Sequence, residues 1–232
     1  LLDDRTMFYT EKCKGFSVRM PNGDVHALYG MKDSSGYASM GSDLHCSNQA
    51  GMLGLAVDPD FAKNRRIYVA SASTKYHGDG CKTNFERCDG NIVMRFEVSK
   101  NFKSVSARTD IVKDIQFKPF ESNHPFGGNG AHNGNRPTFG PEGWLWITTG
   151  DRHRGVCPQS PTLICGKVLR IDTDGNAHPG NNPPKGFDKR IYTYGHRNVQ
   201  GIAFRGDGAA STAEHGPWHN DEFTMLVKGG NG

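Results

Sequence analysis

Apolar and polar residues alternate with a period close to two along most of the chain. This alternation places successive side chains on opposite faces of a strand, so it is typical of half-buried β-strands. The segments that follow it are short, rich in β-branched or aromatic residues and bounded by turn residues; they are 66–73, 91–99, 143–150, 166–173 and 190–195. Only residues 58–64 (DPDFAKN) suggest a helical turn, and they are too few for a regular helix. The pattern predicts an all-β chain.

Two kinds of strand motif recur along the chain. The stretches VMRFEVSKNF and VLRIDTDGNA share an apolar-apolar-Arg-apolar-acid pattern followed by a turn, with Arg95 and Arg170 at matching positions. A strand, a Pro/Asp/Gly turn and a second strand recur over residues 54–69, 137–148 and 201–212. A period of roughly 65 to 80 residues that holds about four short strands is typical of β-propeller blades. A β-sandwich also has many strands but does not repeat in this way.

The repeat also bears on domain organisation. At this period the 232 residues correspond to about three blades, fewer than the roughly four to eight that close a propeller. The sequence opens within a strand pattern and stops at KGGNG without a terminal cap. We therefore expect residues 1–232 to form one partial β-propeller that is incomplete at both ends.

Composition narrows the class of protein without changing the predicted fold. Hydrophobic residues make up 35% of the chain and charged residues 22%, a balance that supports a buried core and argues against disorder. The net charge of +4 comes from Lys and Arg scattered among acids, so we expect a solvated surface and no nucleic-acid partner. No apolar run approaches the roughly 20 residues of a transmembrane helix, so we expect no transmembrane segment.

The six cysteines leave many disulfide pairings open. Two pairs flank polar loops, and we expect Cys81 to pair with Cys88, Cys157 with Cys165, and the remaining Cys13 with Cys46. Short loops closed in this way favour an oxidising compartment, so we expect a periplasmic or secreted protein. Free buried thiols in a cytosolic protein are the alternative. A zinc site is disfavoured, because no pair has the tight C-x2-C spacing of such sites.

Polar residues gather in loops beside the predicted strands. The groups are residues 47–54, 131–136 together with 149–155, 194–201 and 214–222. Equivalent loops of successive propeller blades lie at the same end of the central channel. These separated loops can therefore converge on one site.

The motifs in these loops and strands resemble a known family. They are NQAGMLGLAVDPDFAKNRRIYV, HNGNRPTFGPEGWLWITTGD, GKVLRIDTDG, YGHRNVQGIAF and EHGPWHNDE. Each motif alone is weak, but the five in this order resemble the soluble quinoprotein glucose/sorbosone dehydrogenases, including the aldose sugar dehydrogenases, from about residue 7 to the end. The resemblance implies a six-bladed β-propeller that binds pyrroloquinoline quinone (PQQ) and Ca²⁺.

The resemblance also implies roles for individual residues. His132 matches the family's catalytic base, while Gln49 and Asp151 match active-site contacts. Arg197 and Asn198 match residues that contact the cofactor. A histidine suits the removal of a hydroxyl proton while a hydride leaves for the cofactor, and Asp151 would orient this histidine or the substrate. The planar fork of Arg197 suits carboxylate or quinone oxygens.

The metal positions implied by the resemblance lie near the end of the chain. Gly216 and Pro217 match the pair whose backbone carbonyls hold the Ca²⁺ that touches PQQ. Glu222 matches a ligand of a separate structural Ca²⁺. Ca²⁺ prefers oxygen ligands, and it would polarise the quinone as a Lewis acid. The implied activity is oxidation of an aldose or related sugar at the anomeric carbon, with electrons passing to a cytochrome or a soluble acceptor.

The sequence also departs from the family pattern. Asn135, Arg136 and Pro137 replace the glycine and Arg-Leu that usually follow the catalytic histidine, and a proline removes a strand donor, so we expect a different local path or sugar pocket. The later blades of the family supply further basic residues to PQQ. We therefore do not expect the isolated chain to form the complete site.

Two other functions fit parts of the sequence. A non-enzymatic binding propeller, such as an ectodomain, would have no need for His132, Gln49, Arg197 and Asn198 together. A calcium-dependent propeller lactonase would hold its metal by side-chain carboxylates, whereas the candidate calcium loop here offers backbone carbonyls.

Overall fold

The computed structural model describes residues 1–76, 90–118, 128 and 130–232. Within these residues nearly all regular structure is β. The two helices there, α1 (Phe61–Asn64) and α2 (Val156–Gln159), are single turns, and α1 falls within the predicted helical turn. The predicted all-β fold is confirmed.

The strands of the described residues form four antiparallel or largely antiparallel sheets, three with four strands and one with three. The first contains β1 (Met7–Glu11), β2 (Gly15–Arg19), β3 (Val25–Met31) and β4 (Ser39–Gly41), and the second contains β5 (Met52–Val57), β6 (Arg66–Ser73), β7 (Gly90–Glu97) and β8 (Thr109–Gln116). The third contains β9 (Gly134–Phe139), β10 (Leu145–Thr149), β11 (Lys167–Ile171) and β12 (Ile191–Tyr194), and the fourth contains β13 (Val199–Phe204), β14 (Ala210–Glu214) and β15 (Glu222–Met225). All five strands predicted from the alternation are present, as β6, β7, β10, β11 and β12.

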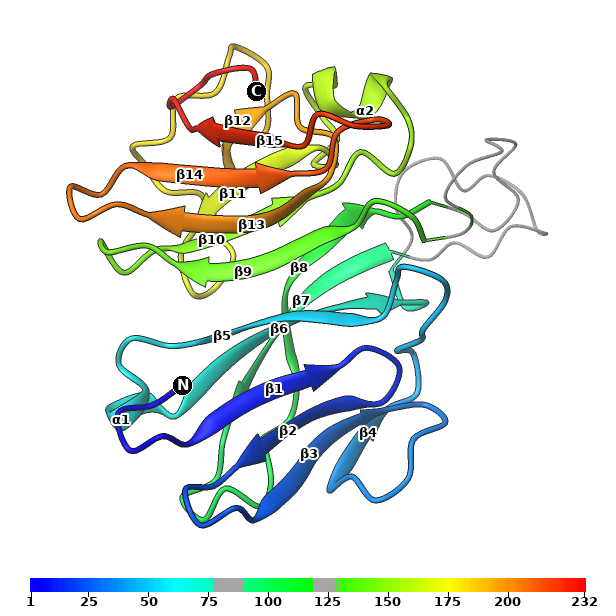
Figure 1. Cartoon of the computed structure of the whole chain (residues 1–232), viewed down its shortest axis with the longest axis vertical. Helices are drawn as coiled ribbons and strands as arrows, with labels where there is room; N and C mark the ends of the chain where they lie inside the picture. The colour runs from blue at the N-terminus through cyan, green and yellow to red at the C-terminus, as the bar shows by residue number, and fades with distance from the viewer. Residues whose placement is uncertain (77–89, 119–127, 129) are drawn as a thin grey trace.

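Each sheet corresponds to one propeller blade. Consecutive strands are neighbours within a sheet, and the first strands of successive sheets lie side by side, since β1 contacts β5, β5 contacts β9 and β9 contacts β13. Figure 1 shows the first sheet at the lower end of the molecule, the second above it, and the third and fourth together at the upper end. This is the radial arrangement of a β-propeller. The described residues form four blades, one more than the three expected. The additional blade is the first sheet, whose β4 pairs in parallel with β3. It carries neither repeated motif, so the sequence repeat does not reveal it.

The repeated motifs occupy equivalent places in successive sheets. Arg95 and Arg170 lie on β7 and β11, each the third strand of its sheet. The strand–turn–strand motifs form the β5–β6, β9–β10 and β13–β14 hairpins, each of which joins the first and second strands of a sheet. The sequence repeat therefore corresponds to a structural repeat.

The core joins neighbouring sheets through large buried side chains. The Phe96 ring lies 5.2 Å from Phe16 and 4.7 Å from Tyr29, which links the second sheet to the first. The Trp146 ring lies 5.2 Å from Phe204, which links the third sheet to the fourth. Burial of one such side chain contributes about 1.5–3 kcal/mol. These contacts hold the blades at a fixed spacing, on which the site depends.

Two of the three predicted disulfides are present, Cys13–Cys46 and Cys157–Cys165, while the predicted Cys81–Cys88 pair lies outside the described residues.

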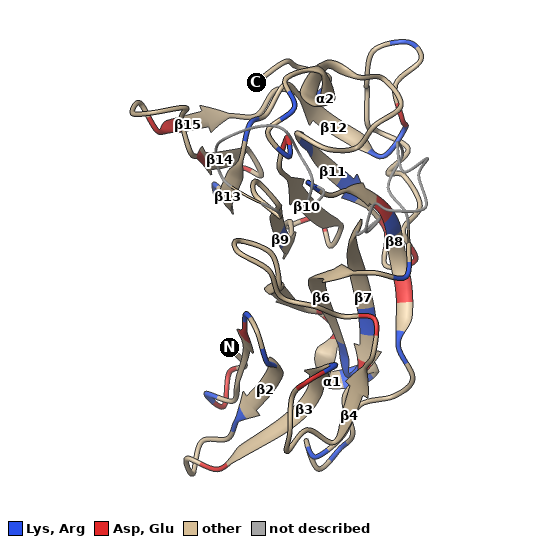
Figure 2. Cartoon of the chain, turned by 90° about the vertical axis from the view of Figure 1, so that its right-hand side faces the viewer, with Lys and Arg blue, Asp and Glu red and all other residues tan. Residues whose placement is uncertain are grey.

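Figure 2 shows Lys and Arg interspersed with Asp and Glu on the side of the molecule that it presents. Among the described helices, none is long and apolar enough to cross a membrane.

Candidate active site

Loops and strand ends of three of the sheets, together with a residue after β1, line an open cavity of about 580 Å³. Small-molecule sites commonly measure roughly 300–1,000 Å³. The cavity lining includes six of the predicted site residues, namely Gln49, His132, Arg197, Asn198, Gly216 and Pro217. Most of them come just before the first strand of a sheet: Gln49 precedes β5, His132 precedes β9, and Arg197 and Asn198 precede β13. The predicted convergence of separated loops is therefore present.

His132 and Asp151 form a buried hydrogen-bonded pair. His132 precedes β9 and Asp151 follows β10, so the β9–β10 hairpin brings them together. His132 Nδ1 lies 2.6 Å from Asp151 Oδ1, and the two residues are 6% and 8% exposed. An ionised carboxylate only accepts hydrogen bonds, so it selects the Nδ1–H tautomer and leaves Nε2 as the basic atom. This is the geometry of an oriented general base.

The backbone around this pair is strained. His132, Arg152 and His153 have φ values of +55°, +51° and +56°, a region that residues other than glycine seldom adopt. Such strain tends to cluster at functional sites. Gly150 lies where the two segments meet, because a Cβ at this position would lie 2.0 Å from the His132 carbonyl oxygen. Only glycine permits this approach, which sets His132 against Asp151.

Two further contacts fix the pair from neighbouring sheets. The Gln49 side-chain oxygen accepts a hydrogen bond from the His132 backbone N–H at 3.0 Å. The Asp151 backbone N–H donates to the Arg197 carbonyl at 2.7 Å. The predicted residues Gln49, His132, Asp151 and Arg197 therefore form one connected group, built from segments beside the second, third and fourth sheets.

Glu214, at the end of β14, anchors the segment that carries Arg197 and Asn198. Its carboxylate accepts hydrogen bonds from the backbone N–H groups of both residues, and it lies 3.0 Å from His196 Nδ1. Burial raises the pKa of Glu214, but the hydrogen bonds from His196 and the backbone outweigh it and leave the pKa lowered. The resulting carboxylate holds Arg197 at the cavity wall, where its guanidinium donates to the His215 carbonyl at 2.9 Å.

Several residues at the site escaped the sequence reasoning. His153 Nε2 lies 2.5 Å from His132 Nε2, and Glu214 acts through the contacts just described. Lys12, Arg136 and Gln200 line the cavity. The available signals were weak: His153 stands two residues after Asp151, and Glu214 opens the EHGPWHNDE motif.

The predicted metal positions divide into two places. Gly216 and Pro217 line the cavity together with Asp221, whose carboxylate accepts a hydrogen bond from the Gly216 backbone N–H at 3.0 Å. Glu222 is exposed at the start of β15, opposite Glu214 in the strand register and outside the cavity lining. Over the described ranges, no three His, Cys, Asp or Glu side chains gather as a metal site. At the cavity, the predicted Gly216 and Pro217 therefore lie beside one carboxylate, that of Asp221.

Residues 135–137, where the sequence departs from the family pattern, contain a β-bulge. Thr148 pairs with Arg136 but Thr149 pairs with Gly134, which leaves Asn135 as the extra residue of β9. Asn135 is fully buried with a φ of +58°, a conformation that asparagine adopts more readily than most residues. Pro137 is tolerated because β9 is an edge strand of its sheet. Opposite the bulge, a Cβ on Gly54 of β5 would lie 2.4 Å from the Asn135 carbonyl oxygen.

Comparison with known proteins places the chain in a family. The family model described as Glucose / Sorbosone dehydrogenase matches residues 1–232. The chain is 27% identical over 249 residues to quinoprotein glucose dehydrogenase B of Acinetobacter calcoaceticus, covering 98% of this chain and 47% of that protein. It is 28% identical over 221 residues to aldose sugar dehydrogenase YliI of Escherichia coli, covering 94% of this chain and 54% of that protein. The chain therefore spans about half the length of these relatives.

Solved structures agree on the fold. The PQQ-bound aldose sugar dehydrogenase of Streptomyces coelicolor superposes with a TM-score of 0.78 at 23% identity, covering 99% of this chain and 59% of that one. The apo form of the soluble aldose sugar dehydrogenase of Escherichia coli gives a TM-score of 0.76 at 26% identity, covering 100% and 60%. With the family model matched along its whole length, the chain belongs to the glucose/sorbosone dehydrogenase family.

Proposed function

We propose that the whole protein is a PQQ- and Ca²⁺-dependent dehydrogenase that oxidises an aldose or related sugar at its anomeric carbon, with His132 as the general base. The observation that carries the proposal is the buried His132–Asp151 pair, whose histidine lines the same cavity as Arg197 and Asn198. The relatives named quinoprotein glucose dehydrogenase and aldose sugar dehydrogenase support this reaction class.

The donor set of the cavity fits an anionic quinone. Arg197, Arg136 and Lys12 bring positive charge to the lining, and Asn198 and Gln200 bring amide groups. Guanidinium groups bind carboxylates through two parallel hydrogen bonds, and PQQ carries three carboxylates. Arg197 and Asn198 are therefore the residues that would hold it. When bound, the quinone supplies the acceptor for the hydride of the sugar.

The turn that contains Gly216 and Pro217 is the candidate calcium contact. Backbone carbonyls and the carboxylate of Asp221 are the hard oxygen donors that Ca²⁺ prefers. Glu222, outside the cavity, stays a candidate ligand of a separate structural ion. In both cases the supporting observation is the donor chemistry of the residues.

The base acts through a defined nitrogen. Because Asp151 binds Nδ1 of His132, the hydroxyl proton of the sugar passes to Nε2. The imidazolium that forms is stabilised by the Asp151 carboxylate, and Gln49 holds the His132 backbone in place. Proton transfer by a positioned side chain contributes about 10²–10⁴-fold to a rate.

The test uses the full-length protein loaded with PQQ and Ca²⁺, because this chain spans about half the length of its relatives. We expect His132→Ala to lower dye reduction by about 10²–10⁴-fold across a panel of aldoses. PQQ binding, followed by absorbance, should be largely retained. His26→Gln is the control, since the His26 ring contacts the Phe102 carbonyl outside the cavity lining.

Two outcomes would contradict different parts of the proposal. Full turnover in His132→Ala would refute the role of this histidine. No dye reduction by the wild-type protein with any sugar would refute the reaction itself.

We also propose a periplasmic or secreted location, with a cytochrome or a soluble molecule as electron acceptor. The Cys13–Cys46 and Cys157–Cys165 disulfides support an oxidising compartment. Cell fractionation tests the location, and reduction of a cytochrome compared with a soluble dye tests the acceptor.

A further inference from the structure

A second histidine contacts the proposed base at the nitrogen that Asp151 leaves open. Nε2 of His153 lies 2.5 Å from Nε2 of His132, and the two rings cross edge to face at 83°. Nδ1 of His153 lies 3.4 Å from Nζ of Lys118, which is 1% exposed. A single hydrogen-bonded series therefore runs from Asp151 through His132 and His153 to Lys118.

The groups at the two ends of this hydrogen-bonded series determine which ring nitrogen of each histidine carries a hydrogen. Asp151 accepts, so His132 carries a hydrogen on Nδ1 and presents a lone pair at Nε2. His153 must then donate from its own Nε2, which leaves its Nδ1 as an acceptor facing the Lys118 amine. One hydrogen thus lies between the two Nε2 atoms.

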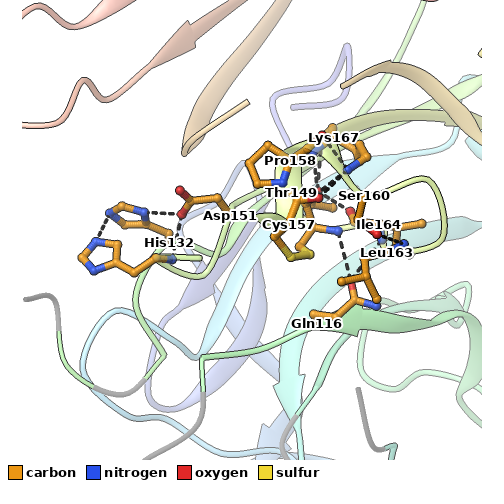
Figure 3. Close-up of a disulfide and its surroundings, with 12 residues drawn as sticks. Gln116, His132, Thr149, Asp151, Cys157, Pro158, Ser160, Leu163, Ile164 and Lys167 are labelled. Carbon is orange, nitrogen blue, oxygen red and sulfur yellow. Dashed lines mark hydrogen bonds and ion pairs between the residues drawn. A yellow bond between two sulfur atoms is a disulfide. The ribbon is translucent and has the colours of Figure 1, made fainter. Parts of the chain in front are cut away.

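His153 is held at this contact by its backbone. Its N–H donates to Asp151 Oδ1 at 2.8 Å, so the same carboxylate oxygen binds the His132 ring and the His153 main chain. The following loop is fixed by Cys157–Cys165 and by Lys167, whose amine donates to the carbonyls of both cysteines. Figure 3 shows Asp151 between His132 and this loop.

The two histidines differ in their access to water. His132 is 6% exposed, whereas His153 is half-buried and is followed directly by exposed residues at 154–156. A proton on His132 therefore needs a carrier to reach solvent when the cavity is filled. His153 stands between the base and the exposed loop.

We propose that His153 is the proton-transfer partner of His132, which carries the proton taken from the sugar to water. The inference rests on the proposed function of His132 as the base. As sugar binds, its hydroxyl replaces His153 at Nε2 of His132. The O–H bond then breaks and its proton bonds to Nε2, while a bound quinone would accept the hydride of the same carbon. While the sugar occupies this contact, His153 exchanges with water, losing its hydrogen at Nε2 and gaining one at Nδ1. When the rings meet again, the proton on His132 passes to the free Nε2 of His153. Release of the Nδ1 hydrogen to water restores the original contact.

The surrounding charges favour transfer of the proton from His132 through His153 to water. Asp151 stabilises the imidazolium of His132, and a protonated Lys118 beside Nδ1 of His153 repels the imidazolium there, which promotes release of its proton. Burial lowers the pKa of Lys118, while the charge of Asp151 acts to raise it. On the cavity side, the charged residues that share the lining with His132 are Lys12, Arg136, Arg197 and Asp221.

The first test is spectroscopic and needs no activity. In full-length protein labelled with ¹⁵N-histidine, we expect a scalar coupling across the hydrogen bond between the Nε2 nuclei of His132 and His153, together with the Nδ1–H tautomer of His132. The coupling should vanish in His153→Gln. Its absence from the wild-type protein would overturn the proposal.

The second test is kinetic, in the holoenzyme. We expect His153→Gln to lower kcat about 10-fold with a small change in KM, and added imidazole to restore part of the kcat of His153→Ala. Arg154→Gln, an exposed change in the same loop, should leave both constants unchanged.

The outcomes separate this inference from the proposed function. If His132→Ala is inactive but His153→Gln turns over like the wild type, only the role of His153 fails. If the wild-type protein oxidises no sugar, the proposed function fails and the proton-transfer role fails with it.

Discussion

The first strands of the sheets differ sharply between their two ends. At the ends of β9 and β13 the chain turns through exposed glycines, Gly143 and Gly208, which take the positive φ values that the turns require. At the start of β9, positive φ falls on His132 and Asn135, both buried and polar. The same strand therefore has an unstrained, solvated end and a strained end with buried polar residues.

This difference distinguishes the strand ends that only join neighbouring strands from the strand ends that line the cavity. The turns at the exposed ends repeat from blade to blade because each needs only to join two strands. The cavity ends carry different residues at equivalent places, with Gln49 before β5, His132 before β9 and Asn198 before β13. Departures from local rules are expected where function requires them. The predictions below test whether the two ends respond differently to substitution.

The largest effect is expected from Asp151→Asn at the cavity end. The amide removes the charge that holds the His132 tautomer, so kcat of the full-length holoenzyme should fall on the order of 10³-fold or more. Thermal unfolding should change little, because the amide keeps a similar shape. Activity within about 10-fold of the wild type would show that Nδ1 of His132 is oriented by another group.

A matched pair of glycine substitutions compares the two ends directly. Gly150→Ala should lower the free energy of unfolding by about 2–4 kcal/mol, because its Cβ would meet the His132 carbonyl at 2.0 Å. Gly143→Ala places its Cβ in open space and suffers only from its φ of +81°, so about 1 kcal/mol is expected. Urea denaturation measures both. Equal losses would contradict the distinction between the ends.

The smallest effect concerns the pH dependence of Glu214. The lowered pKa means that the folded state holds the carboxylate ionised below the ordinary value of 4.5. Its contribution to stability is therefore fully present above pH 4.5 and is lost as the pH falls through the lowered pKa. On acidification, the wild type should lose more unfolding free energy than Glu214→Gln, because only the wild type has a carboxylate to protonate at this position. Parallel acid profiles would exclude this role.

The sequence was sufficient for the strands and their repeat but not for every blade. Alternation and turn residues are local properties, so β6, β7, β10, β11 and β12 could be predicted from them. The first sheet follows the same alternation less clearly and lacks the repeated motifs, so these local properties do not predict it. Blade number depends on strand pairing between distant segments, which the motifs of one strand do not specify.

The candidate site was predictable only where a motif carried it. The resemblance predicts His132, Arg197 and Asn198 as site residues, and the structure brings all three to one cavity. The contacts of His153 and Glu214 depend on positive φ and on the meeting of separate loops. No composition or spacing rule contains that information.

The bulge at Asn135 also restricts how this protein can vary over evolution. Its carbonyl approaches Gly54 so closely that any larger residue at position 54 would require the β9 backbone to change as well. The two positions lie on neighbouring blades and should therefore be inherited together, with a glycine retained wherever the bulge is retained. Substitution is less restricted in the 214–222 segment, where Trp218 is 76% exposed, than along this seam between two strands.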